Sequence, residues 1–241
     1  IWSVTGSLVR NKDKIIELSE AMKEANATLL ETGGATPNKI WQEGDSQNAI
    51  YAVRSLGIDP SNGRELFLKK NGEVTYTWDA NDRVFCGVDQ PDYRGNINTM
   101  FMWKDLSVNL SFGYEWGGQQ YNSTLISRVE NADKKYNVDR RVYEDRWKEP
   151  GDRTFFKGIN ETTATQATSR FVQDEATFTC QNLNVTYDLK GNKWLKRNLG
   201  IQTLTLKGDI ADLFRISTIK QERGTSYPFS RQFSFTLSAM F

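Results

Sequence analysis

Residues 106–116 read LSVNLSFGYEW, and apolar side chains occupy every second position of this stretch. A period of two is the period of a β-strand, in which successive side chains point to opposite faces. One face of this strand would carry leucine, valine and aromatic side chains, and the other would carry serine, asparagine, glycine and glutamate. The stretch therefore predicts a strand that separates an apolar environment from a polar one.

The same alternation recurs along the chain. Residues 93–103 alternate just upstream, and Lys104-Asp105 leaves a two-residue link, which predicts a β-hairpin. Further strands are expected at residues 2–9, 178–189, 203–210 and 227–241, with weaker ones at 49–56 and 66–78, which makes eight. A helix is expected within residues 13–27, inside the link that follows the first strand.

One of these strands changes parity along its length. Phe178 and Cys180 share one parity, whereas Leu183, Val185 and Tyr187 share the other. A β-bulge adds one residue to a strand, so apolar side chains of opposite parity on its two sides point to the same face. The pattern therefore predicts a β-bulge near Gln181-Asn182.

Composition excludes several classes of protein. The chain has 241 residues, no histidine, and 31 lysines and arginines against 30 aspartates and glutamates, a formal net charge of +1. Such a balance argues against nucleic-acid binding. The lack of histidine excludes Ser-His-Asp and Cys-His nucleophile arrangements and histidine-ligated zinc or haem. We expect no enzymatic activity, no cofactor and no resident metal, and the spacing of Cys86 and Cys180 predicts two free thiols.

An acidic loop is the one candidate for a cation. Asp79, Asp82, Asp89 and Asp92 cluster in sequence and carry the oxygen ligands that Ca²⁺ prefers. Their spacing does not fit an EF-hand loop. A solvated acidic loop is the favoured interpretation.

Alternation alone fits two architectures, a soluble β-sandwich and a membrane β-barrel. Three features favour the barrel: the apolar rows run about ten residues, aromatic side chains gather near their ends, and long links alternate with short ones. The polar rows consist of serine, threonine, asparagine and glutamine, which suit a lumen better than an exposed sheet face.

The last alternating row sharpens this prediction. It closes on Phe241 and resembles the terminal strand that outer-membrane proteins present to their assembly machinery. The expected assembly residues are Phe229, Phe233, Phe235, Leu237 and Phe241.

Several motifs together resemble one family. Arg170-Phe171-Val172-Gln173-Asp174 and the segment from Cys180 to Leu189 are similar to a pattern of the SusC/RagA family of TonB-linked outer-membrane transporters. The other segments that fit the family are Leu56–Pro60, Gly117-Gly118, Val138–Arg141, Arg146–Asp152, Leu199–Ile201, Asp212–Phe214 and Gly224–Pro228. The resemblance covers essentially all of residues 1–241.

The resemblance implies a fold and a function. Residues 1–241 would form the last eight strands of a 22-stranded antiparallel transmembrane β-barrel with long extracellular loops, as a C-terminal segment without the plug domain and TonB box. The complete transporter would import glycans or oligopeptides across the bacterial outer membrane. Its partners would be a SusD-like lipoprotein, TonB acting through the missing N-terminal part, and the lipid bilayer.

Aromatic residues in the links are candidates for contact with a substrate or a partner protein. They are Trp41, Tyr121, Trp147, Phe155 and Phe156. Packing of each loop on itself is the competing interpretation. Two alternatives to the transporter segment also stay open, a stand-alone eight-stranded outer-membrane barrel and a secreted carbohydrate-binding β-sandwich.

Overall fold

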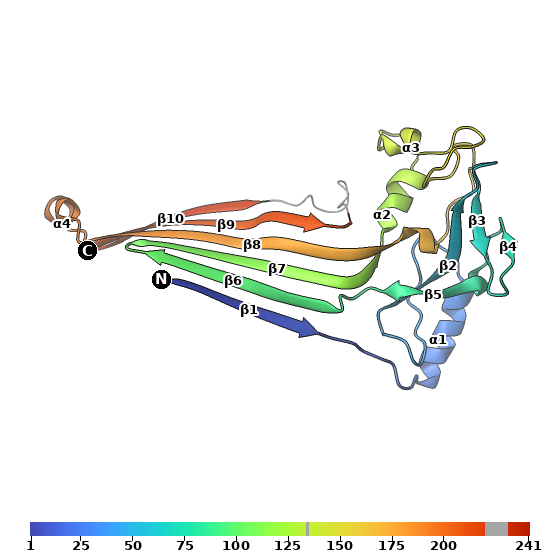
Figure 1. Cartoon of the computed structure of the whole chain (residues 1–241), viewed down its shortest axis with the longest axis horizontal. Helices are drawn as coiled ribbons and strands as arrows, with labels where there is room; N and C mark the ends of the chain where they lie inside the picture. Colours follow the sequence, from blue (N-terminus) through green and yellow to red (C-terminus); the bar gives the residue numbers. More distant parts are fainter. Residues whose placement is uncertain (134, 220–230) are drawn as a thin grey trace. The chain divides into compact units, whose positions relative to one another are not determined.

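A computed structural model describes residues 1–133, 135–219 and 231–241 (Figure 1). The chain divides into two compact units. We call the first, which consists of Ile1–Asn11, Pro91–Gly117 and Glu175–Phe241, the wall unit. We call the second, which consists of Lys12–Gln90 and Gly118–Asp174, the insert unit.

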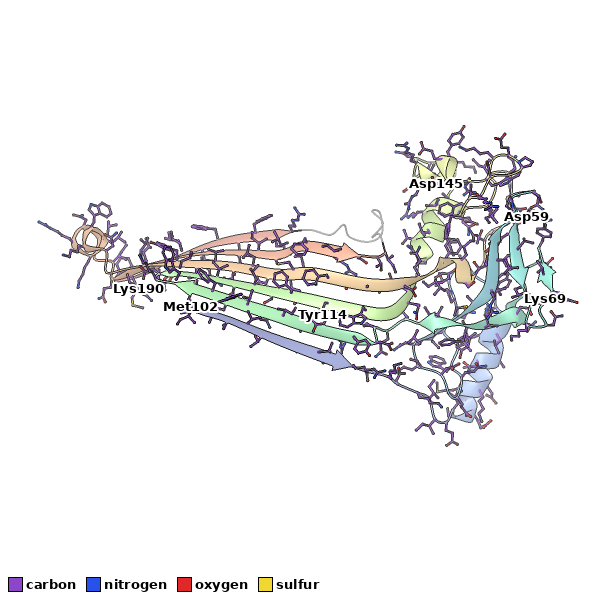
Figure 2. The ribbon with its side chains drawn as sticks, viewed as in Figure 1. Asp59, Lys69, Met102, Tyr114, Asp145 and Lys190 are labelled. Atoms are coloured by element: carbon purple, nitrogen blue, oxygen red, sulfur yellow. The ribbon has the colours of Figure 1, made fainter. Side chains whose placement is uncertain are left out.

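A single antiparallel sheet of long strands makes up the wall unit. Its order is β1-β6-β7-β8-β9-β10. Along the chain, strands that are neighbours in the sheet are connected by short turns or by long insertions. The strands are β1 Trp2–Arg10, β6 Tyr93–Trp103, β7 Leu106–Tyr121, β8 Val172–Lys190, β9 Thr203–Ser217 and β10 Gln232–Met240, and the short helix α4, Lys193–Leu199, links β8 to β9. Figure 2 shows Met102 and Lys190 at the same end of this sheet, with Tyr114 further along β7.

Register joins the apolar rows into one continuous face. Residues opposite one another in an antiparallel pair lie on the same face. Phe112 lies opposite Ile97, and Leu237 lies opposite Leu206, which in turn lies opposite Tyr187. The rings of Phe112 and Phe178 stack on this face with centroids 5.5 Å apart. The predicted apolar face is therefore confirmed across the sheet.

The opposite face is polar and carries its own hydrogen bonds. The side-chain amide of Asn109 donates to Asn184 Oδ1 at 3.4 Å, and that of Asn184 donates to Asp209 Oδ1 at 2.6 Å. These three residues come from β7, β8 and β9, so polar side chains connect neighbouring strands directly. Both predicted faces of the wall are thus present.

Two local predictions about the strands are also confirmed. Lys104, with φ of 53°, and Asp105 form the two-residue turn of the β6–β7 hairpin, across which Trp103 pairs with Leu106. The register of β8 against β9 shifts between Cys180 and Asn182, at the predicted bulge.

The number of wall strands differs from the prediction of eight. The wall sheet contains six strands in the described ranges, and residues 49–56 and 66–78 belong to a separate four-stranded sheet of order β4-β3-β2-β5 in the insert unit. A membrane-spanning strand needs about 9–11 residues. The second segment falls short because a turn at Gly72, with φ of 89°, splits it into two short strands, β3 Glu65–Leu68 and β4 Val74–Thr75. The first segment forms β2, Ala49–Ile58, whose first five residues are all buried, as in a core strand.

The wall sheet is open in the described part of the chain. β1 and β10 each have one strand neighbour and form its two edges. A stand-alone closed barrel of eight strands is therefore not what these residues build.

The insert unit combines its small sheet with short helices. Its remaining elements are β5 Arg83–Val88, α1 Glu20–Glu31, η1 Ala80–Asp82, α2 Ser123–Leu125, η2 Ile126–Glu130, α3 Arg141–Glu144 and η3 Ser169–Phe171. The helix α1 begins later than the predicted residues 13–27, after the extended residue Ser19. Within the described ranges, no helix has the length and apolar character needed to cross a membrane.

Two apolar clusters form the core of the insert unit. One contains Leu125, Ile126, Val129, Val142, Phe156 and Phe171, and the other contains Ile40, Ala49 and Tyr51. The first cluster draws all of its residues from the segment 118–174, whereas the second comes from 12–90.

Candidate functional site

An arginine with a buried side chain connects several elements of the insert unit. The guanidinium of Arg170, in η3, donates to both carboxylate oxygens of Glu65, at 3.0 and 2.7 Å, and to both of Glu130, at 2.8 and 2.7 Å. It also lies over the ring of Phe171, 4.5 Å from the centroid. Burial acts to lower the pKa of Arg170, but the hydrogen bonds and charges of the two carboxylates outweigh it and raise the pKa. Arg170 therefore stays charged.

Further polar side chains surround this centre. Arg146 donates to the carbonyl oxygens of Val129 and Glu130, and Thr165 donates its hydroxyl to Glu130 Oε1 at 2.9 Å. Lys157 is also buried and donates to the carbonyl oxygen of Thr163. We call Glu65, Glu130, Arg146, Lys157 and Arg170 the buried charge cluster.

No sequence pattern predicts most of this cluster. Arg170 stood out only as part of a family-like motif, and its two partners lie 105 and 40 positions away. Contacts between residues so far apart in the chain produce no local pattern in the sequence. Removal of one charged side chain from a buried ion pair strongly lowers the stability of the fold. The cluster therefore holds β3, η2 and η3 together.

Two of the predicted contact aromatics pack inward. Phe156 is 3% exposed and belongs to the first apolar cluster. Tyr121 donates its hydroxyl to the carbonyl oxygen of Ala35 at 3.0 Å, and its ring meets Phe171 edge-on. Packing within the loops accounts for both side chains.

Trp147 anchors a neighbouring loop. Its indole Nε1 donates to the carbonyl oxygen of Pro60 at 2.9 Å. A Cβ atom at Gly63, whose φ is +73°, would collide with the Trp147 ring. The glycine is needed here for its backbone conformation and for the close approach of the indole.

Phe155 is exposed, and Trp41 is half-buried. Phe155 is 41% exposed and meets Phe156 and Phe171 edge-on, with centroids 5.0 and 5.6 Å away. Trp41 lies on the wall of an open cleft of about 750 Å³, which we call the Trp41 cleft. Phe85, an exposed ring that the sequence did not single out, lines the same cleft. The structure thus does not bring the five predicted aromatics into one site.

A second cleft, of about 530 Å³, opens beside the buried charge cluster. We call it the Trp78 cleft. Its lining residues are Gly33, Arg64, Glu65, Phe67, Tyr76, Thr77, Trp78, Lys157, Glu161, Thr163, Ala164, Thr165 and Gln166. Aromatic and charged side chains thus face the same space, a combination that small-molecule sites use.

The acidic loop uses its carboxylates locally. Asp79 accepts a hydrogen bond from the backbone N–H of Asn81 and caps η1, and Asp82 accepts one from the N–H of Lys70. The described residues contain no group of three or more histidine, cysteine, aspartate or glutamate side chains arranged for a metal ion. Cys86 and Cys180 are free thiols, as predicted.

The predicted assembly residues lie on or beside the edge strand β10. Phe233, Phe235 and Leu237 share the apolar face and are highly exposed, and Phe241 follows the strand. Phe229, and with it Tyr227 and the motif Gly224–Pro228, lies outside the described residues. The shared face is confirmed for the three described residues of the strand, and their role in assembly stays a prediction.

Comparisons with known proteins show which solved structures have a similar fold. No protein-family model matches the sequence, and no curated protein sequence matches it. Among solved structures, the RagAB peptide transporter matches 90% of this chain with a TM-score of 0.68 and 19% identity. The RagAB peptide importer in its open-open state matches 100% with a TM-score of 0.73, and in its closed-closed state 99% with a TM-score of 0.70, both at 19% identity.

These matches confirm the resemblance at the level of the fold. The chain is all-β with mostly antiparallel strands, and the wall unit is a segment of a barrel wall of the kind these transporter structures contain. The chain spans about a quarter of the length of the matched chains, 24% to 27%.

Proposed function

We propose that this chain forms part of the wall and of the outer loops of a TonB-dependent transporter in the bacterial outer membrane, similar to SusC. One observation carries the proposal: a long-stranded sheet with one apolar and one polar face, in a fold that matches peptide-transporter structures along nearly the whole chain. The transporter would import glycans or oligopeptides without altering them chemically, and it needs no cofactor for this.

The two faces have different tasks in this proposal. The apolar face would contact lipid, because backbone groups in a closed barrel are paired and only apolar side chains need to meet the hydrocarbon. The polar face would line the lumen. It includes a groove of about 450 Å³ in which Arg94 lies opposite Glu115, and Arg215 pairs with Glu175 at 3.3 Å. Charged groups beside a hydrated path suit the passage of polar solutes.

The insert unit would face a surface lipoprotein similar to SusD. Both of its segments leave the wall after β1 and β7, which run in the same direction because each is antiparallel to β6. The insertions Lys12–Gln90 and Gly118–Asp174 would therefore emerge at one end of the wall, on the outer side. Phe155, which is exposed, and Trp41, which is half-buried on the wall of an open cleft, are the proposed contact residues. TonB would act through a plug domain, which the resemblance implies for the complete transporter.

Purification from native membranes tests this proposal. An affinity tag on the full-length protein that carries this chain should recover an outer-membrane complex with a surface lipoprotein. Deletion of residues 133–165 should weaken that complex while the wall still inserts, as heat-modifiable gel migration reports. Recovery of the protein from the soluble fraction without detergent would support a secreted sandwich instead, and an unchanged complex after the deletion would contradict the docking role.

A further inference from the structure

The Trp78 cleft has a rigid aromatic wall. The indole Nε1 of Trp78 donates to the carbonyl oxygen of Ala167 at 3.1 Å, and the guanidinium of Arg83 lies 5.4 Å from the centre of its ring. Tyr76 donates its hydroxyl to Asp59, and Arg64 lies 4.8 Å from the centre of the Tyr76 ring. Both rings are therefore fixed before any ligand arrives, which lowers the entropic cost of binding. Figure 2 labels Asp59, the residue that holds Tyr76.

The charges behind this wall do not balance. The buried charge cluster contains three cations, Arg146, Lys157 and Arg170, and two carboxylates, Glu65 and Glu130. At the mouth of the cleft, Arg64 and Glu161 lie 3.6 Å apart and offset one another. One positive charge is thus left over in a buried place, where an uncompensated charge is costly.

Among the described residues, Arg146 and Lys157 are the two cations of the cluster without an ion pair, and Lys157 is the one that lines the cleft. Lys157 is 5% exposed, and within the described ranges its ammonium donates one hydrogen bond, to Thr163, and forms no ion pair with a carboxylate. An ammonium has three N–H donors. Two donors are left for a ligand, and both would be charge-assisted.

Gln166, which lines the cleft, holds an unused acceptor. Gln166 Oε1 is buried and has no hydrogen-bond partner among the described residues. It lies 3.0 Å from the place where a Cβ atom would stand on Gly33, next to the Trp78 ring. A ligand group with an N–H or O–H would satisfy it.

We propose that the Trp78 cleft binds a carboxylate carried on a group with a flat or apolar face. The carboxylate would pair with Lys157, the flat face would pack on Trp78 and Tyr76, and a donor of the ligand would reach Gln166. Two sources supply this chemistry, the C-terminus of an oligopeptide and a uronic-acid residue of a glycan. The inference rests on the proposed function, for which it adds an acidic substrate end held by the outer loops.

Ligand pairs that differ only in charge test the proposal. The full-length protein, purified in detergent, is titrated by calorimetry with an acetylated tripeptide ending in phenylalanine and with its C-terminal amide. Trigalacturonate and its methyl ester form the second pair. The charged member of at least one pair should bind about tenfold or more tightly than its neutral partner. Equal affinity within both pairs, or no binding of any probe, would overturn the proposal.

Variants then locate the binding. Lys157→Met should lose the preference for the charged ligand without loss of thermal stability, because it removes the excess charge and keeps an unbranched chain. Lys69→Met is the matched control, since Lys69, labelled in Figure 2, is partly exposed and pairs with Glu73 at 3.1 Å. A preference for the charged ligand that survives Lys157→Met would refute the site.

A second variant tests the site even if Lys157→Met does not fold. Gly33→Val introduces methyl groups beside Gln166 and Trp78 and leaves every charge in place. It should weaken the charged ligand by about tenfold or more, and unchanged affinity would contradict the site. The lipoprotein complex should persist in both variants. Loss of ligand binding with an intact complex therefore concerns this cleft alone, and loss of the complex concerns the proposed function.

Discussion

Arg170 and Glu65 are joined by two hydrogen bonds, of 3.0 and 2.7 Å, although 105 positions separate them along the chain. Glu65 belongs to the insertion after β1, and Arg170 to the insertion after β7. A second carboxylate, Glu130, occupies the other edges of the same guanidinium. One buried cation therefore ties the two insertions into one unit.

Replacement of that cation should destabilise the insert unit. In Arg170→Met, two carboxylates are left buried without their partner, which costs about 3–5 kcal/mol of unfolding free energy. Urea titration in detergent, followed by tryptophan fluorescence, measures the change. Arg140→Met is the control, because Arg140 pairs with Glu144 at the surface, and it should change little. Recovery of stability in the triple variant with Glu65→Gln and Glu130→Gln would support this origin of the loss.

The two faces of the wall should respond differently to charge. Leu110 lies opposite Thr99 on the apolar face, and Ser111 lies opposite Asn98 on the polar face. Leu110→Arg should cost about 2 to 4 kcal/mol if the residue lies near the middle of the bilayer, and Ser111→Arg much less. Refolding titrations into lipid vesicles compare them. Equal costs would argue against the assignment of the faces.

The sequence predicted the wall better than the insertions, for a physical reason. In a strand with one apolar and one polar face, apolar and polar residues alternate along the sequence. This alternation predicts β6, β7 and the bulge of β8. β2 carries no such period, because its first half is buried on both faces, so its place outside the wall could not be predicted. The sequence of a loop does not indicate which of its rings the fold buries, so the burial of Phe156 could not be predicted.

Assembly should depend on the aromatic row of β10. Phe233 and Phe235 lie opposite Ile210 and Gly208 and are highly exposed on the apolar face. Their joint replacement by serine should lower the amount of inserted full-length protein, because the edge strand then offers less apolar area to lipid. Heat-modifiable gel migration and surface labelling measure insertion, with Ser234→Ala as the control on the other face. Normal insertion with reduced uptake would instead indicate a role in transport.

Binding in the Trp78 cleft should weaken as the pH rises. Burial lowers the pKa of Lys157, although nearby carboxylates oppose the effect. A carboxylate ligand prefers the charged ammonium, so affinity should fall as pH rises through the pKa of Lys157 in the free protein. Calorimetry over a pH series checks this against the neutral ester, whose affinity should stay constant. Between the pKa of Lys157 in the folded protein and its higher pKa in the unfolded chain, the unfolded chain binds more protons. The stability of the ligand-free protein should therefore rise with pH in that window.

Two glycines with left-handed backbones should differ in their tolerance of alanine. Gly72, with φ of +89°, has open space around its Cβ position, whereas at Gly63 that position is filled by the Trp147 ring. Gly72→Ala should lose roughly 1–2 kcal/mol through backbone strain alone. Gly63→Ala should lose about 1–3 kcal/mol more through the clash. Thermal unfolding of both variants measures the difference, and equal losses would mean that the indole moves aside freely.

The Arg170 pairing also dictates an order of events during biogenesis. Glu65 and Glu130 are synthesised before Arg170, so the two carboxylates stay unpaired and hydrated until the second insertion is nearly complete. Closing a contact over 105 positions is slow compared with forming a hairpin of consecutive strands. The insertions therefore stay open chain for longer than the β6–β7 hairpin, which leaves an incomplete molecule exposed to proteases at these insertions.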